Sequence, residues 1–136
     1  ANQGQTRFDR KEALVFREDN VIRIRLVGLI FDSGKTKIPS EAYPLLDKMD
    51  QYLGLYLNTK IIIEGHTDAT GKEDKNLSYS KTRANSVRDY LLQLGNVSED
   101  NITASGLGSS VPVASNKTRA GRAQNRRIVV IIAFEP

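Results

Sequence analysis

The sequence predicts an α+β fold, a two-layer sandwich in which helices pack on one face of a mixed β-sheet. Three observations support this prediction. Five short segments have the alternating or continuous apolar pattern of strands, and two longer segments carry apolar residues at helical spacing. Their order is strand, strand, helix, strand, helix, strand, strand, which places the helices between strands that can pair in parallel. The length of 136 residues is typical of a single domain.

The chain opens with a predicted hairpin. Its strands are expected over residues 13–17 and 21–26, with a tight turn at residues 18–20. Polar and apolar residues alternate in the second strand, so one of its faces is apolar. Residues 1–10 are mostly polar, with Gln and Asn among them, and we expect residues 1–12 to be a flexible linker or tail, with the domain over residues 13–136.

The first helix is predicted within residues 40–56, where apolar side chains recur at helical spacing. Ser40 is its candidate cap, and Pro44 fits only the opening turn. Residues 60–66 are predicted to form a strand. Residues 61–63 are apolar on both faces, as in a central strand that is covered at least partly on both sides.

The second helix is predicted over residues 80–94, with Ser80 as its cap and Gly95 as its stop. Its buried stripe consists of Ala84, Val87, Leu91 and Leu94. A short strand over residues 102–105, a long polar loop over 106–124 and a last strand over 127–134 complete the chain. A loop of that length is often functional.

Composition excludes several classes of site. The chain has no Cys and one His, so disulfide and thiol chemistry are excluded and a transition-metal site is not expected. The net charge is +4, but no run of Lys or Arg exceeds two residues, which argues against a nucleic-acid-binding arm. The apolar runs are too short to span a bilayer. We expect any export signal or membrane anchor of the parent chain to lie outside this segment.

Asp68 and Arg83 form the most informative pair. The predicted strand over residues 60–66 delivers Asp68 to a loop at its carboxyl end, where ligands of α/β sheets collect. Arg83 is expected in the first turn of the second helix, where the helix dipole disfavours a cation unless an anion binds there. A carboxylate and a guanidinium so placed suit a small zwitterion, with Asp68 binding its ammonium and Arg83 its carboxylate.

Structural roles compete with this interpretation. Arg83 can instead pair with Asp68 or point into water, and Asp68 can form an Asx turn. His66 beside Asp68 or Asp32 has the make-up of a general base pair, but the sequence offers no nucleophile, so a structural hydrogen bond is favoured and no enzyme activity is expected.

Two consecutive arginines precede the last strand. Strand alternation directs the side chains of Arg126 and Arg127 to opposite faces. One of them can therefore reach a ligand pocket while the other is solvated.

Several ordered motifs together resemble the OmpA-like peptidoglycan-binding domain, a family that also occurs in peptidoglycan-associated lipoprotein and flagellar stator proteins. Its core signature matches Gly65-His66-Thr67-Asp68, Gly71, Asn76, Ser80, Arg83-Ala84 and Val87. Further matches are Phe31-Asp32, Gly106, Gly108, Pro112, Asn116-Lys117-Thr118, Gly121-Arg122-Ala123 and Asn125-Arg126-Arg127. The resemblance covers roughly residues 14–134 and implies a βαβαβ core with an N-terminal hairpin.

The resemblance implies non-covalent binding of the peptidoglycan stem peptide, chiefly through diaminopimelate, without cofactor or metal. It assigns Asp68 and Arg83 to the grip on the ligand, with Asn76 and Arg126 as further contacts. It places Thr67, Phe31 and Asp32 along the site. The implied role is to anchor an outer-membrane or envelope protein to the cell wall, on the periplasmic side of the outer membrane of a Gram-negative bacterium.

The resemblance also suggests how the ligand is selected. Lysine lacks the second carboxylate of diaminopimelate, so a lysine stem would leave Arg83 unpaired, which makes Arg83 the expected selectivity element. The family often has Leu where this chain has Tyr79, whose ring can pack and whose hydroxyl can reach the ligand.

Three other functions remain open on the sequence. The same fold can act mainly as a protein–protein interaction module of the envelope, with a stable partner or dimer. A basic nucleic-acid binder would show salt-sensitive binding to DNA or RNA, and we expect none. A wall hydrolase would release fragments from sacculi and would depend on His66 or Asp68.

Overall fold

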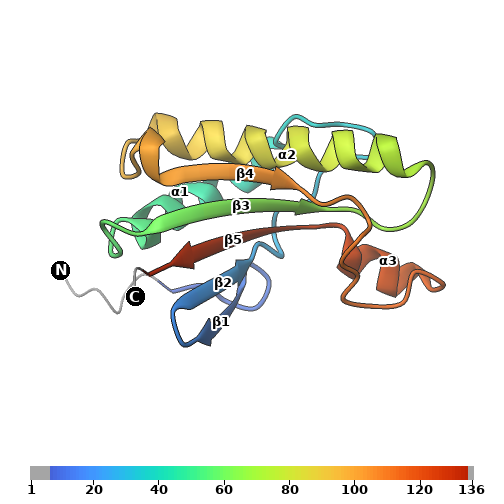
Figure 1. Cartoon of the computed structure of the whole chain (residues 1–136), viewed down its shortest axis with the longest axis horizontal. Helices are drawn as coiled ribbons and strands as arrows, with labels where there is room; N and C mark the ends of the chain where they lie inside the picture. The colour runs from blue at the N-terminus through green and yellow to red at the C-terminus, as the bar shows by residue number, and fades with distance from the viewer. Residues whose placement is uncertain (1–6, 135–136) are drawn as a thin grey trace.

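The computed structural model describes residues 7–134 as one mixed five-stranded sheet with helices (Figure 1). The strands are β1 (Leu14–Glu18), β2 (Val21–Arg25), β3 (Lys60–His66), β4 (Ile102–Gly106) and β5 (Arg127–Ala133). The helices are α1 (Tyr43–Leu53), α2 (Glu73–Leu94) and α3 (Arg119–Asn125), with single 3-10 turns at Ser40–Ala42 and Glu99–Asn101.

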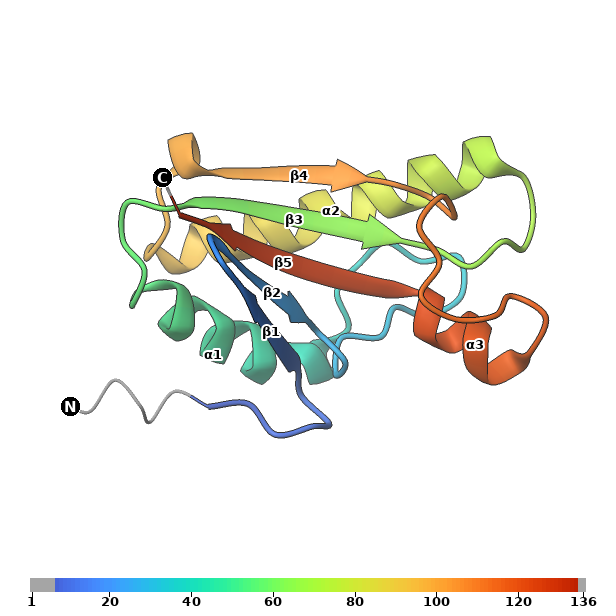
Figure 2. The same ribbon diagram turned by 60° about the horizontal axis from the view of Figure 1, so that its bottom comes forward.

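The strand order across the sheet is β1-β2-β5-β3-β4. Strands β3 and β4 pair in parallel, and all other pairs are antiparallel. Helices α1 and α2 cover one face of the sheet, and α3 lies at the end where β5 begins (Figures 1 and 2). The predicted two-layer α+β sandwich is therefore confirmed, including the opening hairpin and the interior position of β3.

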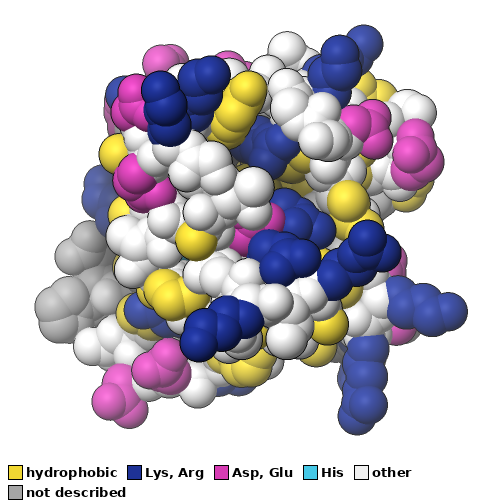
Figure 3. Space-filling model, turned by 90° about the vertical axis from the view of Figure 1, so that its right-hand side faces the viewer, with side chains coloured by type: hydrophobic (Ala, Val, Ile, Leu, Met, Phe, Trp, Pro, Cys, Tyr) yellow, Lys and Arg dark blue, Asp and Glu magenta, His cyan; other side chains and the backbone are white. Residues whose placement is uncertain are grey.

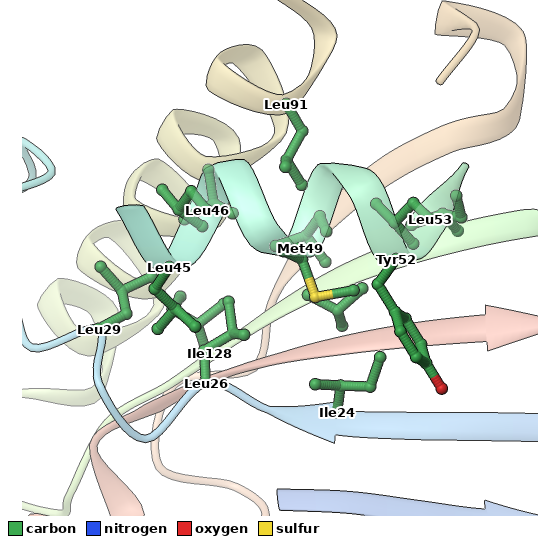
Figure 4. Packing of buried hydrophobic residues seen from close by; sticks show 14 of the residues in the cluster. Ile24, Leu26, Leu29, Leu45, Leu46, Met49, Tyr52, Leu53, Leu91 and Ile128 are labelled. Carbon is green, nitrogen blue, oxygen red and sulfur yellow. The ribbon is translucent and has the colours of Figure 1, made fainter. Parts of the chain in front are cut away.

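The core fills the space between the sheet and the two long helices. Side chains of α1 point toward the strands in Figure 4, and Leu46, Met49 and Leu53 among them are fully buried. They meet Ile24 of β2 and Leu91 of α2, which are also fully buried. Burial of this apolar surface, at roughly 25 cal/mol per Å², is the main force that holds the layers together.

The start of α2 differs from the prediction. The helix begins at Glu73, not at Ser80, so Ser80 lies inside it and Arg83 is in its third turn. Two acidic residues in the true first turn, Glu73 and Asp74, favour a start there through the helix dipole. Ser80 is no cap: its buried hydroxyl accepts a hydrogen bond from the amide of Gly108 at 3.0 Å. The dipole argument for an anion at Arg83 is therefore wrong.

The predicted long loop over residues 106–124 is also partly wrong, because it contains most of α3. The hydroxyl of Thr118 accepts from the amide of Gly121 and caps this helix. In the sequence, Gly121 favoured the prediction of a loop. In the structure it allows close approach, because a Cβ atom there would collide with the carbonyl of Ser115.

Half of the predicted tail, residues 1–6, lies outside the described residues. In the described part, the ring of Phe8 packs edge-on against Tyr52 with 5.4 Å between centroids. Glu12 pairs with Lys48 at 2.8 Å. The boundary between tail and domain stays a prediction.

Helix α2 approaches β3 and β4 closely at two glycines. A Cβ atom at Gly65 would collide with the carbonyl of Ser80, and one at Gly106 would collide with the backbone of Lys81. Both glycines are needed to bring the middle of α2 against the ends of these strands. This contact fixes the position of Arg83 relative to the loop after β3.

We expect Gly65→Ala to lower the free energy of unfolding by about 1–3 kcal/mol, because the added methyl group must push α2 off the sheet. Denaturant unfolding followed by circular dichroism measures this. Ser105→Ala on the opposite face of β4 is the control and should change little. An unchanged midpoint for Gly65→Ala would mean that α2 does not depend on this close contact.

Candidate functional site

A cleft of about 830 Å³ opens at the end of the molecule where β3 ends and α2 and α3 begin. Its walls come from the segment after β2, the end of β3 with its following loop, α2, and α3. Figure 3 views this end and shows Lys and Arg side chains on several sides of an acidic side chain near the middle of the face. The cleft is thus a mainly basic site with a carboxylate inside it.

Asp68 lies in this cleft with its side chain nearly buried. Its Oδ2 accepts from Nη1 of Arg126 at 2.6 Å, and its Oδ1 accepts from the amide of Thr70 at 2.8 Å. The bond to Thr70 is an Asx turn, so this structural alternative from the sequence is present. It holds the carboxylate in a fixed orientation in the cleft.

The surroundings of Asp68 favour its ionised form. Burial works against ionisation, but the amide of Thr70 and the guanidinium of Arg126 outweigh it and hold the pKa of Asp68 below its ordinary value. Asp68 is therefore a carboxylate at neutral pH, ready to accept hydrogen bonds from an ammonium group.

Arg83 reaches the cleft from α2 and is held by neutral partners. Its Nε donates to the carbonyl of Lys35 at 2.8 Å, and its Nη2 donates to the carbonyl of Asp32 at 3.3 Å. The guanidinium also lies over the rings of Phe31 and Tyr79, 5.1 and 5.7 Å from their centroids. The two structural roles considered from the sequence were an ion pair with Asp68 and a side chain that points into water. Neither describes Arg83, because Asp68 pairs with Arg126 and Arg83 is half-buried.

Burial lowers the pKa of Arg83 from its ordinary value, and the nearby charge of Arg126 acts in the same direction. Among residues 7–134 no carboxylate forms an ion pair with Arg83. An oxyanion bound to the free edge of this guanidinium would compensate its charge.

Asn76 and Thr67 shape the loop that carries Asp68. The buried side chain of Asn76 donates to the carbonyls of Thr70 and Asp68, which ties the loop to the first turn of α2. The hydroxyl of Thr67 donates to the carbonyl of Asp68, and its amide donates to the carbonyl of Gly108. Both residues line the cleft. Their hydrogen bonds to the backbone carbonyls of Asp68 and Thr70 hold the loop.

The structure brings most of the sequence-predicted site residues together. Six of the seven line the cleft: Phe31, Thr67, Asp68, Asn76, Arg83 and Arg126. Asp32 borders it through its carbonyl on Arg83, while its side chain is exposed. The sequence predicted that one of Arg126 and Arg127 reaches a pocket while the other is solvated. Both line the cleft. Arg127 is buried and donates to the carbonyls of Asn125 and Val111.

His66 lines the cleft but faces a different partner from those considered in the sequence. Its Nε2 lies 3.3 Å from Oε1 of Glu64, and neither Asp68 nor Asp32 bonds to it among the described residues. This hydrogen bond lowers the pKa of Glu64 despite partial burial. The arrangement agrees with the structural role favoured for His66.

Sequence reasoning missed three residues here. Asn125 is completely buried, and its amide bonds to Val113, Ala114 and Asn116, which fixes the loop before α3. Arg25 and Arg122 line the cleft as well. Arg25 appeared only as a polar position of an alternating strand. Arg122 lay in a predicted loop and in a motif of the family resemblance, but neither residue was assigned to the site.

Charge in the cleft is unbalanced. Five arginines line it, Arg25, Arg83, Arg122, Arg126 and Arg127, against one carboxylate, Asp68. Among residues 7–134, Arg126 is the only one of the five in an ion pair. The cleft is therefore suited to a ligand that carries more negative than positive charge.

The described part of the chain has neither a metal-binding cluster nor a membrane-spanning helix. Residues 7–134 contain no group of three or more His, Asp or Glu side chains placed to hold a metal ion. None of the helices there combines the length and the apolar character that crossing a bilayer requires.

Comparison with known proteins gives a consistent result. A sequence model described as the OmpA family matches residues 30–126. Outer membrane porin F of Pseudomonas aeruginosa is 38% identical over 115 residues, which cover 85% of this chain and 33% of that protein. Peptidoglycan-binding protein ArfA of Mycobacterium tuberculosis is 40% identical over 101 residues, or 74% of this chain and 30% of that protein. The chain thus spans about a third of the length of these relatives.

Among solved structures, the cell wall anchor of the T6SS from Pseudomonas aeruginosa has a TM-score of 0.80 and 25% sequence identity. The match covers 92% of this chain and 90% of that one. The similarity extends over the sheet and the helices, so the whole architecture is shared.

The contacts of Asp68 predict its titration. We expect the carboxyl of Asp68, followed by NMR, to titrate below its ordinary value of 3.8, and Arg126→Gln to move the midpoint upward. Because the folded pKa lies below the unfolded one, ionised Asp68 stabilises the fold above its unfolded pKa, and this contribution is lost as the pH falls through the folded pKa. A midpoint above 3.8 in the unmodified domain would contradict this account.

Proposed function

The chain belongs to the OmpA family, and we propose that its cleft binds the peptide stem of peptidoglycan without covalent chemistry. The observation that carries the proposal is the placement of Asp68 and Arg83 in one cleft, each with hydrogen-bonding capacity left for a ligand. One relative is named as a peptidoglycan-binding protein and one structural neighbour is a cell wall anchor, and both support the same function.

Diaminopimelate is the proposed group of the stem that enters the cleft. Its far end is an amino acid with one ammonium and one carboxylate, which match an ionised aspartate and an arginine without an anionic partner. Lysine at the same place in the stem offers the ammonium but no carboxylate. Arg83 would then stay half-buried against Phe31 and Tyr79 without a counter-ion, which costs free energy.

The resulting role is that of an anchor. We place the domain on the periplasmic side of the outer membrane, where it ties a longer envelope protein to the cell wall, without a cofactor and without catalysis. The names of the relatives, an outer membrane porin among them, support an envelope location. His66 bonds to Glu64 and not to Asp68 or Asp32 among the described residues, so the base pair considered for a hydrolase is not formed there.

The alternative is that the same fold serves mainly as a protein–protein interaction module of the envelope. Binding to isolated sacculi separates the two roles, because an interaction module would give a stable partner or dimer and no response to stem peptides. Release of soluble fragments from the sacculi would instead indicate an enzyme.

The first prediction of the proposal concerns the two gripping residues. We expect Asp68→Ala and Arg83→Ala each to weaken binding to sacculi by about tenfold to a hundredfold while the domain stays folded, because each removes a charge-assisted hydrogen bond. Co-sedimentation with sacculi measures the loss. Asp74→Ala and Arg88→Ala, which change the same residue types on α2 outside the cleft lining, are matched controls. Unaltered binding by either folded cleft variant would refute the assigned role.

The second prediction concerns selectivity. In calorimetric titration we expect a diaminopimelate stem peptide to bind at least about tenfold more tightly than the same peptide with lysine, because only the former supplies a carboxylate for Arg83. Arg83→Ala should remove most of this difference. Equal affinity of the unmodified domain for the two peptides would keep peptidoglycan binding but exclude Arg83 as the discriminating residue.

A further inference from the structure

A second pair of arginines lines the cleft apart from Arg83 and Arg126. Arg25 ends β2 and Arg127 begins β5, the neighbouring strand. Arg25 is paired with Val129, two residues along β5 from Arg127, so both arginines lie on the sheet face that α1 and α2 leave uncovered. We call the part of the cleft lined by Arg25, Gln124 and Arg127 the second lobe.

The charges of this pair are poorly compensated. Burial lowers the pKa of Arg25, and burial together with the nearby charge of Arg25 lowers the pKa of Arg127 to about 10. No carboxylate among residues 7–134 forms an ion pair with either arginine. The carboxylate of Glu64 acts on Arg127 only at longer range, and its hydrogen bond goes to His66. Two adjacent, desolvated cations without an anion are unfavourable.

Part of each guanidinium has a structural use. Arg25 donates to the carbonyl of Gln124 at 2.8 Å, which fastens α3 to the sheet. Arg127 donates to Asn125 and Val111 and so supports the loop before α3. These neutral acceptors leave donors of both side chains unused within the described residues, and they do not cancel the charge.

The size of the cleft leaves room for more than one amino acid. Pockets of about 300–1,000 Å³ hold drug-sized ligands, and this cleft of about 830 Å³ contains both arginine pairs. A peptide whose zwitterionic end lies at Asp68 and Arg83 would extend along the remaining lining.

We propose that the second lobe binds a further carboxylate of the same peptide, with Arg25 as its principal contact. The inference rests on the proposed function and extends it: the domain distinguishes stem peptides that carry a free carboxylate outside diaminopimelate from those in which it is an amide. An amide keeps the shape of the ligand but has no negative charge. It therefore cannot form the ion pair that Arg25 and Arg127 do not have with any described residue.

The experiment is a titration, at constant ionic strength, with two stem peptides that both contain diaminopimelate. They differ only in the carboxylate outside diaminopimelate, which is a free acid in one peptide and an amide in the other. We expect the unmodified domain to bind the acid about tenfold more tightly. Arg25→Gln should bring the ratio of the two affinities close to one, and Arg25→Lys, which retains the charge but not the planar fork, should retain part of it.

Arg23→Gln is the matched control, because Arg23 lies on the same face of β2 but pairs with Glu18 outside the cleft. It should leave the acid-to-amide ratio unchanged, since long-range charge effects alone would lower the ratio in both variants. Equal affinities of the unmodified domain for acid and amide would overturn the second lobe, as would a normal ratio in Arg25→Gln. Binding of the amide peptide tests the proposed function separately, and loss of binding to both peptides would overturn that function as well.

Discussion

The close packing of α2 on β3 and β4 is the constraint on which the site depends. Gly65 and Gly106 leave no side chain between the strands and the helix backbone, so Ser80 reaches Gly108 and closes the contact with a buried hydrogen bond. Asp68 follows β3, and Arg83 lies one turn of α2 beyond Ser80. Their relative position is therefore set by backbone contact and not by flexible side chains, as preorganised binding requires.

Electrostatics is the second organising feature of this end of the molecule. The arginines of the cleft are oriented by backbone carbonyls from loops and from α3, which are neutral acceptors. This arrangement gives each guanidinium a fixed direction without neutralising it. Arg126 is the exception, because its partner is the carboxylate of Asp68. Arg126 remains half exposed, so a ligand ammonium and this arginine can share the carboxylate.

Much of the fold was predictable because hydrophobic periodicity reflects burial. The hairpin, the interior strand and the last strand all appear as alternating or continuous apolar runs, and the structure has each of them near its predicted bounds. The start of α2 was not predictable in this way. Its first two turns pack mainly through polar contacts, such as those of Asn76, so they carry no apolar stripe. Ser80 is a residue type that commonly caps helices, which placed the predicted start seven residues too late.

The sequence by itself determined the two-layer fold and, through ordered motifs, the identity of the main cleft residues. Only the tertiary structure decided their partners: Arg126 on Asp68, two aromatic rings on Arg83, and Arg25 beside Arg127. The physical reason is that these contacts join residues far apart in the chain. Local patterns record which face of a strand or helix is buried, but they do not record which distant side chain lies opposite.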